Sequence, residues 1–328
     1  MVRRLFFCRR SLPAVERVTR LRTMDIDSRL TGLPDIPDLP PGEPERLAEG
    51  LWSSIYRLGD GSLLKLVRRA GSGLGSGEAI FRREAIAYDA LSDVRGTHFT
   101  LPRLIGQGEL EGGASLHAGW LRLSAHDGRA LQADQLVYAP AQTRDAIGER
   151  IGAAIAEFHE LGQSMAKEAG LKLGDTISRS IGLAVHRMGQ PDERLLAERL
   201  ADAWAVEAAS GPLSFVHGDM NLSNILGKAG AHRQAQTGPL GLIDLAETGW
   251  SLPETDFRHL ERFGPMGEAV LRGYEARSGR DVSMKRVRLA LAANALCTLA
   301  IEGQSGHPRE GMRRRAAFTH AMEAAGIA

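Results

Sequence analysis

An aspartate and an asparagine lie five residues apart in a short polar segment, His217 to Asn224, which reads HGDMNLSN. Transfer of a γ-phosphoryl group needs a carboxylate directed at the attacking hydroxyl and oxygen ligands that hold magnesium on the phosphates. Asp219 offers the carboxylate. Asn224 can turn back across a tight loop so that its amide oxygen reaches the metal, and His217 would brace the loop. The segment therefore predicts phosphoryl-transfer chemistry.

A second carboxylate follows at the end of a short apolar stretch. Residues Gly241 to Leu245 read GLIDL and predict a strand that ends near Asp244, 20 residues beyond Asn224. That position suits a second magnesium ligand. An HGD tripeptide alone is often a plain turn, with glycine at the bend and aspartate accepting backbone hydrogen bonds. Several motifs in the expected order favour the catalytic interpretation over the turn.

These residues together resemble the aminoglycoside phosphotransferase and choline kinase-like family of small-molecule kinases. The resemblance rests on the HGD-x-x-x-x-N loop, the Ile243-Asp244 strand end and Pro253-x-x-Asp256, and it covers Gly50 to Phe257. It implies an α+β, bilobal protein kinase-like fold, with a small β-rich N-lobe and a larger helical C-lobe. It also implies that Asp256 braces the catalytic loop, a role compatible with a simple helix N-cap.

A lysine stands in the middle of the apolar pattern Leu63 to Val67, which predicts a strand. Lysine is rare in this chain, which carries most of its positive charge as arginine, and this argues against a lysine that merely snorkels from a sheet edge. By resemblance, Lys65 contacts the α- and β-phosphates, and Glu84 in the predicted helix Ala79 to Leu91 holds it in place. The alternative for Glu84 is a solvent-facing residue paired with a basic neighbour.

The nucleotide loop is predicted between Gly50 and Leu58, which read GLWSSIYRL and lack a G-x-G-x-x-G motif. The stretch resembles the short serine loop of the small-molecule family, so Ser53 and Ser54 are candidates for phosphate contacts, although two serines between strands also suit a hairpin turn. The glycine-rich run Gly71 to Gly77 follows the lysine, and we interpret it as a linker. The absence of G-x-x-x-x-G-K-[ST] argues against a Walker-type P-loop.

The two lobes are expected to meet after a strand at Gly119 to Leu123, which reads GWLRL. By resemblance, Leu123 and the backbone of the connection Ser124 to Asp127 bind adenine. The predicted organisation is an N-terminal extension over residues 1–44, an N-lobe over residues 45–123 that binds nucleotide, and a C-lobe over residues 124–328 with the catalytic loop and the acceptor site.

Three helices are predicted in the C-lobe. The first carries apolar residues at helical spacing, at Ile147, Ile151, Ile155 and Phe158, and should pack beneath the catalytic loop. His159 beside this stripe is interpreted as a structural residue rather than a catalytic one. The other two are expected at Val282 to Ile301 and at Glu310 to Met322.

The acceptor is expected to be a small molecule. Only eleven residues separate Asp244 from Asp256, which leaves no room for the long segment on which protein kinases dock peptides. Four carboxylates could meet a cationic acceptor such as an aminosugar or choline, or could equally be solvated surface: Glu247, Glu254, Glu261 and Glu302. The sequence therefore does not identify the acceptor.

Composition fits a two-lobed soluble protein, with 328 residues, 43% of them hydrophobic and 25% charged. The net charge of +1 gives no general attraction to nucleic acid or to acidic lipid, so neither a nucleic acid nor a membrane is expected as a partner. Cys8 and Cys297 have no companions with zinc-ligand spacing. Two cysteines and no secretory signal predict a cytoplasmic location. The oligomeric state stays open.

The arginine-rich segment Met1 to Thr23 has a single acidic residue, Glu16. Its composition resembles a targeting presequence, and a misassigned start before Met24 explains it equally well; we expect it to be disordered. The proline-rich stretch Gly32 to Pro44 should run extended into the catalytic module.

The predicted activity is transfer of the γ-phosphoryl group from Mg-ATP, with GTP possible, to a hydroxyl of a small molecule. Lys65 and Glu84 hold the phosphates, Asn224 and Asp244 hold Mg²⁺, and Asp219 accepts the hydroxyl proton. One alternative is a catalytically silent kinase-like protein that binds nucleotide or regulates a partner. The other is a protein Ser/Thr kinase. The intact set of polar residues favours a small-molecule kinase.

Overall fold

The computed structural model describes residues 34, 36–69, 75–91, 93–110, 116–126, 128–132, 136, 138–227, 238–302 and 308–327. Every helix and strand named below lies within residues 40–328. The prediction for Met1 to Thr23 falls outside the described residues, as do residues 71–74 of the glycine-rich run and Asp127 of the adenine connection.

The N-terminal part is a five-stranded antiparallel sheet with the strand order β1-β2-β3-β6-β5. The strands are β1 (Glu45–Glu49), β2 (Ser53–Arg57), β3 (Leu63–Arg68), β5 (Leu104–Glu109) and β6 (His117–Leu123). The central strand β3 reads LLKLVR, and its four inner residues are buried. Lys65 therefore lies within a buried strand.

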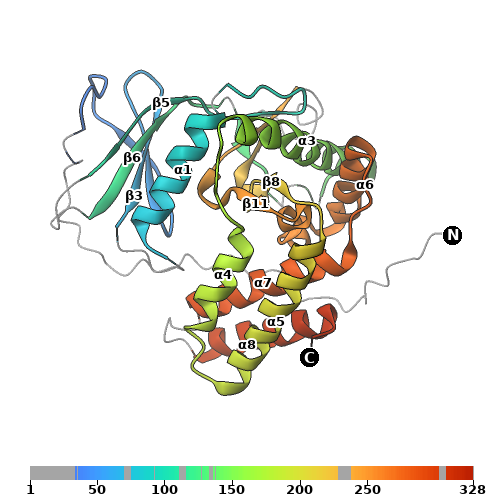
Figure 1. The fold of residues 1–328 in the computed structure, drawn as a ribbon. Coiled ribbons are helices and arrows are strands. Elements are labelled where there is room, and N and C mark those ends of the chain that lie inside the picture. Colours follow the sequence, from blue (N-terminus) through green and yellow to red (C-terminus); the bar gives the residue numbers. More distant parts are fainter. Residues whose placement is uncertain are drawn as a thin grey trace. The chain divides into compact units, whose positions relative to one another are not determined.

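Helix α1 (Gly77–Leu91) packs on this sheet against β3 and β6 (Figure 1). Its apolar residues Ile80, Phe81 and Tyr88 recur at helical spacing and are buried. The ring of Phe81 lies directly over Gly119 of β6, where a Cβ atom would come within 2.6 Å of it. Glu84 is on the same buried face of the helix, so an ionisable side chain is placed between α1 and the sheet.

The rest of the chain is mainly helical (Figure 1). Its α-helices are α3 (Ala141–Glu168), α4 (Thr176–Val185), α5 (Pro191–Ser210), α6 (Gly267–Ser278), α7 (Met284–Glu302) and α8 (Pro308–Ala325), and its 3-10 helices are η1 (Leu222–Asn224), η2 (Leu245–Glu247), η3 (Pro253–Phe257) and η4 (Leu260–Met266). Short strands form two further sheets.

These sheets lie where the predicted catalytic residues are. One has the order β4-β10-β9-β7, and the other pairs β11 with β8. The strands are β4 (Phe99–Thr100), β7 (Arg129–Ala130), β8 (Ser214–Val216), β9 (Ile225–Gly227), β10 (Leu240–Leu242) and β11 (Gly249–Ser251). Each has only two or three residues and therefore few hydrogen bonds of its own. Packing against the core must keep these strands in place.

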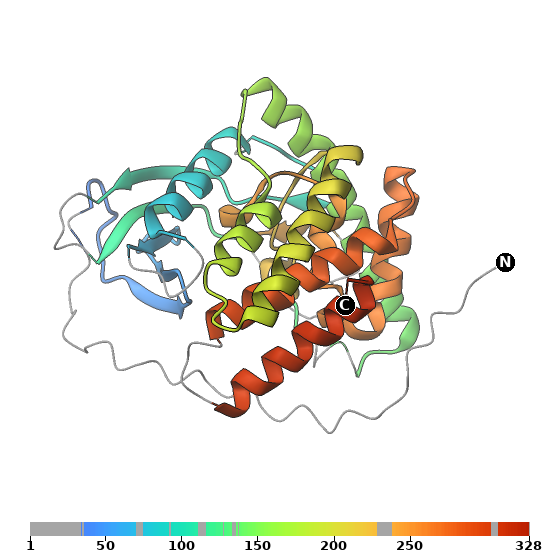
Figure 2. The same cartoon turned by 60° about the horizontal axis from the view of Figure 1, so that its bottom comes forward.

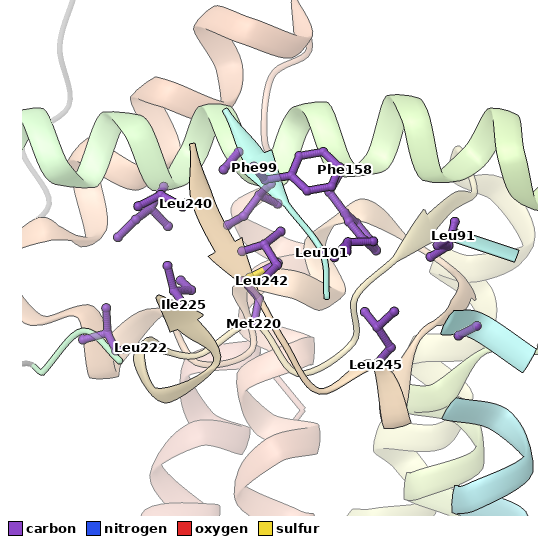
Figure 3. Close-up of a cluster of buried hydrophobic side chains, with 14 of the residues drawn as sticks. Leu91, Phe99, Leu101, Phe158, Met220, Leu222, Ile225, Leu240, Leu242 and Leu245 are labelled. Carbon is purple, nitrogen blue, oxygen red and sulfur yellow. The ribbon is translucent and has the colours of Figure 1, made fainter. Parts of the chain in front are cut away.

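Two groups of buried apolar side chains supply that packing. One includes Phe99, Phe158, Met220 and Leu242, and Figure 3 shows these side chains gathered between α3 and the short strands. The other lies among α4, α5, α7 and α8, which Figure 2 shows side by side, and it includes Trp204. Because Met220 belongs to the first group, the core anchors the segment that carries Asp219.

The structure confirms the α+β fold class, with a β-rich N-terminal part and a helical C-terminal part. The helix expected at Ala79 to Leu91 lies within α1, and the one expected at Glu310 to Met322 lies within α8. Helix α7 begins at Met284, two residues after the predicted start at Val282. Helix α3 extends well beyond the apolar stripe that predicted it.

Two glycines let α3 and α6 pack backbone against backbone. A Cβ atom on Gly152 of α3 would lie 2.0 Å from the carbonyl oxygen of Val270, and one on Gly273 of α6 would lie 2.0 Å from the carbonyl oxygen of Glu149. Neither clash could be relieved by a side-chain rotation, because the contacted atoms belong to helix backbone. The positions therefore set how closely the two helices approach.

We expect Gly152→Ala to lower the free energy of unfolding by about 1–3 kcal/mol, because the added methyl group must push α6 away. Urea unfolding followed by circular dichroism measures this. The matched control is Gly182→Ala on the exposed face of α4, where an added Cβ has no neighbour within 4 Å. There the loss of glycine's backbone freedom should raise stability by about 0.5–1 kcal/mol. Equal stability of the two variants would contradict the proposed close packing.

Candidate active site

The segment His217 to Asn224 is held between two pairs of short strands. β8 ends at Val216 and pairs with β11, and β9 begins at Ile225 and pairs with β10. The backbone N–H of Ile243 donates to the carbonyl oxygen of Asn224 at 3.1 Å. Asn224 is thereby placed next to the turn that carries Asp244.

Within the segment, the side chains of Asp219 and Asn224 are joined directly. The amide nitrogen Nδ2 of Asn224 donates to the Oδ2 atom of Asp219 at 3.0 Å and to its carbonyl oxygen at 2.9 Å. Asn221 caps the intervening helix η1, because its Oδ1 atom accepts from the backbone N–H of Ser223 at 2.9 Å. The loop therefore holds the two predicted catalytic side chains in contact.

Gly218 is required by the shape of this loop. Its φ of +83° is in the left-handed region that side chains other than glycine rarely adopt. A Cβ atom at this position would also lie 2.0 Å from the carbonyl oxygen of Glu247. The glycine of the HGD motif thus permits both the backbone turn and the approach of η2.

The carboxylate of Asp256 binds the backbone at the start of the loop. This carboxylate is fully buried and accepts three hydrogen bonds, from the backbone N–H of His217 (3.0 Å), from that of Gly218 (2.6 Å) and from Nε2 of His159 (2.8 Å). Burial alone would raise the pKa of Asp256, but the hydrogen bond and charge of His159 and the contacts of His217 outweigh burial and lower it. Asp256 contacts the loop rather than the reacting groups.

We expect Asp256→Ala to lower the free energy of unfolding by about 3–5 kcal/mol, since it leaves buried donors without a partner. The contribution of Asp256 should disappear as pH falls through its lowered pKa, because the unfolded state then binds more protons than the folded state. Thermal unfolding of variant and wild type from pH 7 to pH 3 measures both effects. Asp145→Ala, at a side chain that is 53% exposed, is the control, and an effect of equal size there would contradict the bracing role.

Lys65 connects the sheet, α1 and the turn after β10. Its Nζ atom lies 2.7 Å from Oε1 of Glu84 and 2.9 Å from Oδ1 of Asp244. Lys65 is 7% exposed and Glu84 is fully buried, so neither is the surface residue of the alternative interpretation. Burial opposes the charge on Lys65, but the two carboxylates outweigh it and raise its pKa well above the usual value. The lysine is therefore charged throughout the physiological pH range.

Two oxygen atoms, one on Asp244 and one on Asn224, are suited to a magnesium ion. Oδ2 of Asp244 and Oδ1 of Asn224 have no hydrogen-bond partner within the described part of the chain. The Asp244 side chain is 40% exposed. Its φ of +69° turns it away from the line of β10, and its N–H donates to the hydroxyl of Tyr88 at 3.2 Å. Mg²⁺ prefers one or two such protein oxygens together with phosphate and water, so the residues fit that ion.

Glu84 has an unusual protonation equilibrium. Its second oxygen, Oε2, is buried and has no hydrogen-bond partner in the part of the chain that the structure describes. Burial raises the pKa of Glu84 from 4.5 to about 7 against the opposing effect of Lys65. Between these two values the folded state binds a proton that the unfolded state has lost.

The free energy of unfolding should therefore lose a contribution from Glu84 as pH rises from about 5 to 7. Glu84→Gln removes that titration, so the stability of the variant relative to wild type should increase over this range. Urea unfolding at pH 5, 6 and 7 measures the difference. A difference that does not change with pH would contradict the raised pKa.

The predicted nucleotide-loop residues lie on β2, the strand that pairs with the Lys65 strand β3. Ser53 and Ser54 open β2 and pair with Val67 and Leu66 of β3. The turn before them is closed by the N–H of Gly50, which donates to the carbonyl oxygen of Ser53 at 2.8 Å. Among the described residues, neither serine forms a hydrogen bond with Lys65 or Asp244. Their assignment to the nucleotide stays a prediction.

Leu123 ends β6 beside Leu63 and is buried. The chain then turns at Ser124, whose N–H donates to the carbonyl oxygen of Arg103 at 2.9 Å and whose hydroxyl accepts from the N–H of Arg103 at 2.8 Å. The connection after the sheet is thus tied to the residue that precedes β5. Its contact with adenine also stays a prediction.

Two residues that sequence reasoning missed contact the predicted catalytic carboxylate. Oδ1 of Asp219 accepts from Nη2 of Arg258 at 3.0 Å and from Nε2 of His259 at 2.7 Å. Burial would raise the pKa of Asp219, but the hydrogen bond from His259 and the charge of Arg258 outweigh it and hold that pKa well below its usual range. Only their position just after Asp256 could have drawn attention to them.

Comparisons with known proteins identify the family and the fold of the chain. The model of a family described as a phosphotransferase enzyme family matches residues 44–290. No curated protein sequence matches the chain. Within the described residues, no helix is long and apolar enough to cross a membrane.

Several solved structures share the fold. The GDP complex of aminoglycoside 2′-phosphotransferase-IIIa superposes with a TM-score of 0.64 at 16% sequence identity, over 88% of this chain and 94% of that chain. A choline/ethanolamine kinase family protein from Mesorhizobium loti gives 0.55 at 17% identity, over 88% and 93%. A ternary complex of a related phosphotransferase with streptomycin and ATP gives 0.56 at 16% identity, over 86% and 91%. The expected bilobal protein kinase-like fold is confirmed.

Proposed function

The chain belongs to the phosphotransferase enzyme family, and we propose that it transfers the γ-phosphoryl group of a nucleoside triphosphate to a hydroxyl group of a small molecule. The observation that carries this proposal is the continuous set of contacts across the site. Lys65 joins Glu84 to Asp244, and Asn224 joins the turn of Asp244 to Asp219. A carboxylate, two free oxygen ligands and a buried lysine are the groups that the reaction needs.

In the proposed reaction, Asp219 receives the acceptor hydroxyl through Oδ2, the oxygen that accepts only one hydrogen bond in the described residues, from Asn224. The hydroxyl oxygen forms a bond to the γ-phosphorus, and the bond between the γ-phosphorus and the β,γ-bridging oxygen breaks. The electron pair of that bond leaves with the nucleoside diphosphate. The hydroxyl proton passes to Asp219. No covalent phosphoenzyme is required.

The other residues prepare the site for this step. Lys65, held by Glu84, would contact the nucleotide phosphates, and Asn224 and Asp244 would hold Mg²⁺ through their free oxygens. When bound, Mg²⁺ neutralises charge on the β- and γ-phosphates. Arg258 and His259 fix the direction of the Asp219 carboxylate from the side opposite Asn224, so the base is oriented before the acceptor arrives.

We propose that ATP donates the phosphoryl group, with GTP as the alternative donor. The structures similar to this chain include complexes with GDP, with ADP and with ATP. Some of those proteins are solved with kanamycin, gentamicin or streptomycin, and this supports a hydroxylated small molecule as acceptor. A cytoplasmic location, expected from the presence of only two cysteines, is part of the proposal.

The test is magnesium-dependent consumption of ATP and GTP by the purified full chain, measured with aminoglycosides, amino alcohols, sugars, hydroxy acids and sugar phosphates as acceptors. Stimulation by one acceptor, with a phosphorylated product seen by mass spectrometry, supports the proposal. Nucleotide binding without turnover on any acceptor would instead indicate a silent nucleotide-binding protein. Incorporation of phosphate into protein substrates would indicate a protein kinase.

A further inference from the structure

Basic side chains lie beside Asp219 and the neighbouring Glu247. Arg258 and His259 contact Asp219, and Arg179 contacts the neighbouring Glu247, with Nη2 of Arg179 lying 3.2 Å from Oε2 of Glu247. A third arginine, Arg83 of α1, also faces Glu247. We call Arg83, Arg179, Arg258 and His259 the basic cluster.

The positive charge of this cluster comes from its arginines and is matched by nearby carboxylates. Three guanidinium groups face the carboxylates of Asp219 and Glu247, and Asp175 is a third carboxylate, which faces Arg83. The Nη1 atom of Arg83 donates to two neutral oxygens, the carbonyls of Thr248 at 2.7 Å and Gly174 at 3.2 Å. Burial lowers the pKa of His259, so the positive charge of the cluster at neutral pH is that of the guanidinium groups.

Two arginines of the basic cluster have N–H donors that form no hydrogen bond within the described part of the chain. Nε of Arg179 is buried without a hydrogen-bond partner, and Nη1 of Arg258 has none within the described part of the chain. A guanidinium group carries five N–H donors in a planar fork that matches a carboxylate or a phosphate. Buried donors without partners are rare in proteins, so Nε of Arg179 points to a ligand, and Nη1 of Arg258, whose side chain is 12% exposed, is a second donor that an anion could use.

Two of the carboxylates that could attract a cationic acceptor are already in contact with other groups. Glu247 is paired with Arg179. Glu254 is buried, and its Oε1 atom accepts from the N–H of Ser283 at 3.1 Å, while its Oε2 atom has no hydrogen-bond partner in the described part of the chain. Glu261 is exposed, and the side chain of Glu302 lies outside the described residues. A cationic acceptor at Asp219 would instead meet the charge of Arg258.

We propose that the acceptor carries a carboxylate or phosphate group close to the hydroxyl that is phosphorylated, and that Arg258 and Arg179 bind this group. The inference rests on the proposed function, since it takes Asp219 as the site of the acceptor hydroxyl. Oδ1 of Asp219 stays with Arg258 and His259, while Oδ2 retains room for the hydroxyl, because a carboxylate offers about four acceptor positions.

The test compares acceptors that share a carbon skeleton and differ in charge. Glucose, glucosamine, gluconate and glucose 6-phosphate form one such series, and glycerol, serinol, glycerate and glycerol phosphate form another. We expect kcat/KM for an anionic member to exceed that of its neutral and cationic partners by about tenfold or more. A comparison of kcat/KM between the carboxylate and phosphate members of each series shows which anion the site prefers.

Variants of the two arginines test the assignment. Arg258→Met and Arg179→Met should each raise KM for the preferred anionic acceptor by about tenfold or more while KM for ATP changes less than about twofold. Arg272→Met, at a side chain of α6 that pairs with Asp145 and Glu149, should change neither. If Arg258→Met does not fold, Arg179→Met alone decides. A preference for neutral or cationic acceptors with KM unaffected by both arginines overturns the inference.

A separate binding measurement decides the case in which no acceptor of any charge is phosphorylated. That result counts against the proposed function. Calorimetric titration of the protein with gluconate and with inorganic phosphate, in the presence of Mg-ADP, then tests the anion site by itself. Binding that is lost in Arg258→Met or Arg179→Met, but kept in Arg272→Met, supports the inference, and no binding or unchanged binding overturns it.

Discussion

Asp219→Asn is expected to fold normally and to lower kcat by about 10²–10⁴. The amide has the size of the carboxylate, so the loop between His217 and Asn224 should keep its shape. An amide cannot take up the acceptor proton, and it presents one oxygen where the carboxylate presents two. Arg258 and His259 both donate to Oδ1, so the remaining amide oxygen would stay with them and leave none for the acceptor hydroxyl.

The measurement is turnover with the acceptor found by the screen, together with the affinity for Mg-ADP. Binding of Mg-ADP should stay within about twofold of wild type, because the loss lies in the chemical step. Asp145→Asn is the matched control, since Asp145 is on α3 and its side chain is 53% exposed. Turnover close to that of wild type in Asp219→Asn would show that Asp219 is not the base.

The catalytic loop was predictable because its chemistry lies in one short stretch of sequence. Asp219 and Asn224 are five residues apart, and a separation this small can be closed by a local turn, as the hydrogen bond between their side chains shows. Lys65 was singled out for another reason. A charged residue within an apolar strand pattern needs a partner when it is buried, and the structure places Glu84 and Asp244 at that position.

Arg258 and His259 could not be predicted in the same way. They lie about 40 residues from Asp219 in the sequence, and they reach it only because η3 turns back under the loop. That turn depends on Asp256 accepting hydrogen bonds from His217 and Gly218. No periodicity or spacing in the sequence encodes such a contact, because tertiary packing alone brings the segments together.

The short strands could not be predicted from the sequence either. β8, β9, β10 and β11 have three residues each, too few for an alternating pattern to distinguish a strand from a buried loop. Their pairing is visible only in the folded chain, where β9 and β10 bring Asn224 beside Ile243. The sequence showed that Asp244 ends an apolar stretch, and the structure adds the left-handed turn that directs it toward Lys65.

The second large effect is expected for Lys65→Met, which should lower kcat/KM for the nucleotide by about 10²–10³, as removal of one preorganised donor does in other enzymes. Methionine fills much the same space in β3 but leaves the phosphates without this cation. It also leaves Glu84 and Asp244 without a shared counter-charge. Glu84 should then be protonated over a wider pH range, so the stability of the variant should fall more as pH rises above 7.

Steady-state kinetics, Mg-ATP titration calorimetry and urea unfolding at pH 6 and pH 8 check these effects. Lys285→Met is the control, because Lys285 is 68% exposed and pairs with Glu207 away from the site. If Glu84 acts only by holding Lys65, then Glu84→Gln should cost less activity than Lys65→Met. The double variant should then lose no more than Lys65→Met alone, since coupled residues are not additive. Additive losses would mean that Glu84 has a role independent of the lysine.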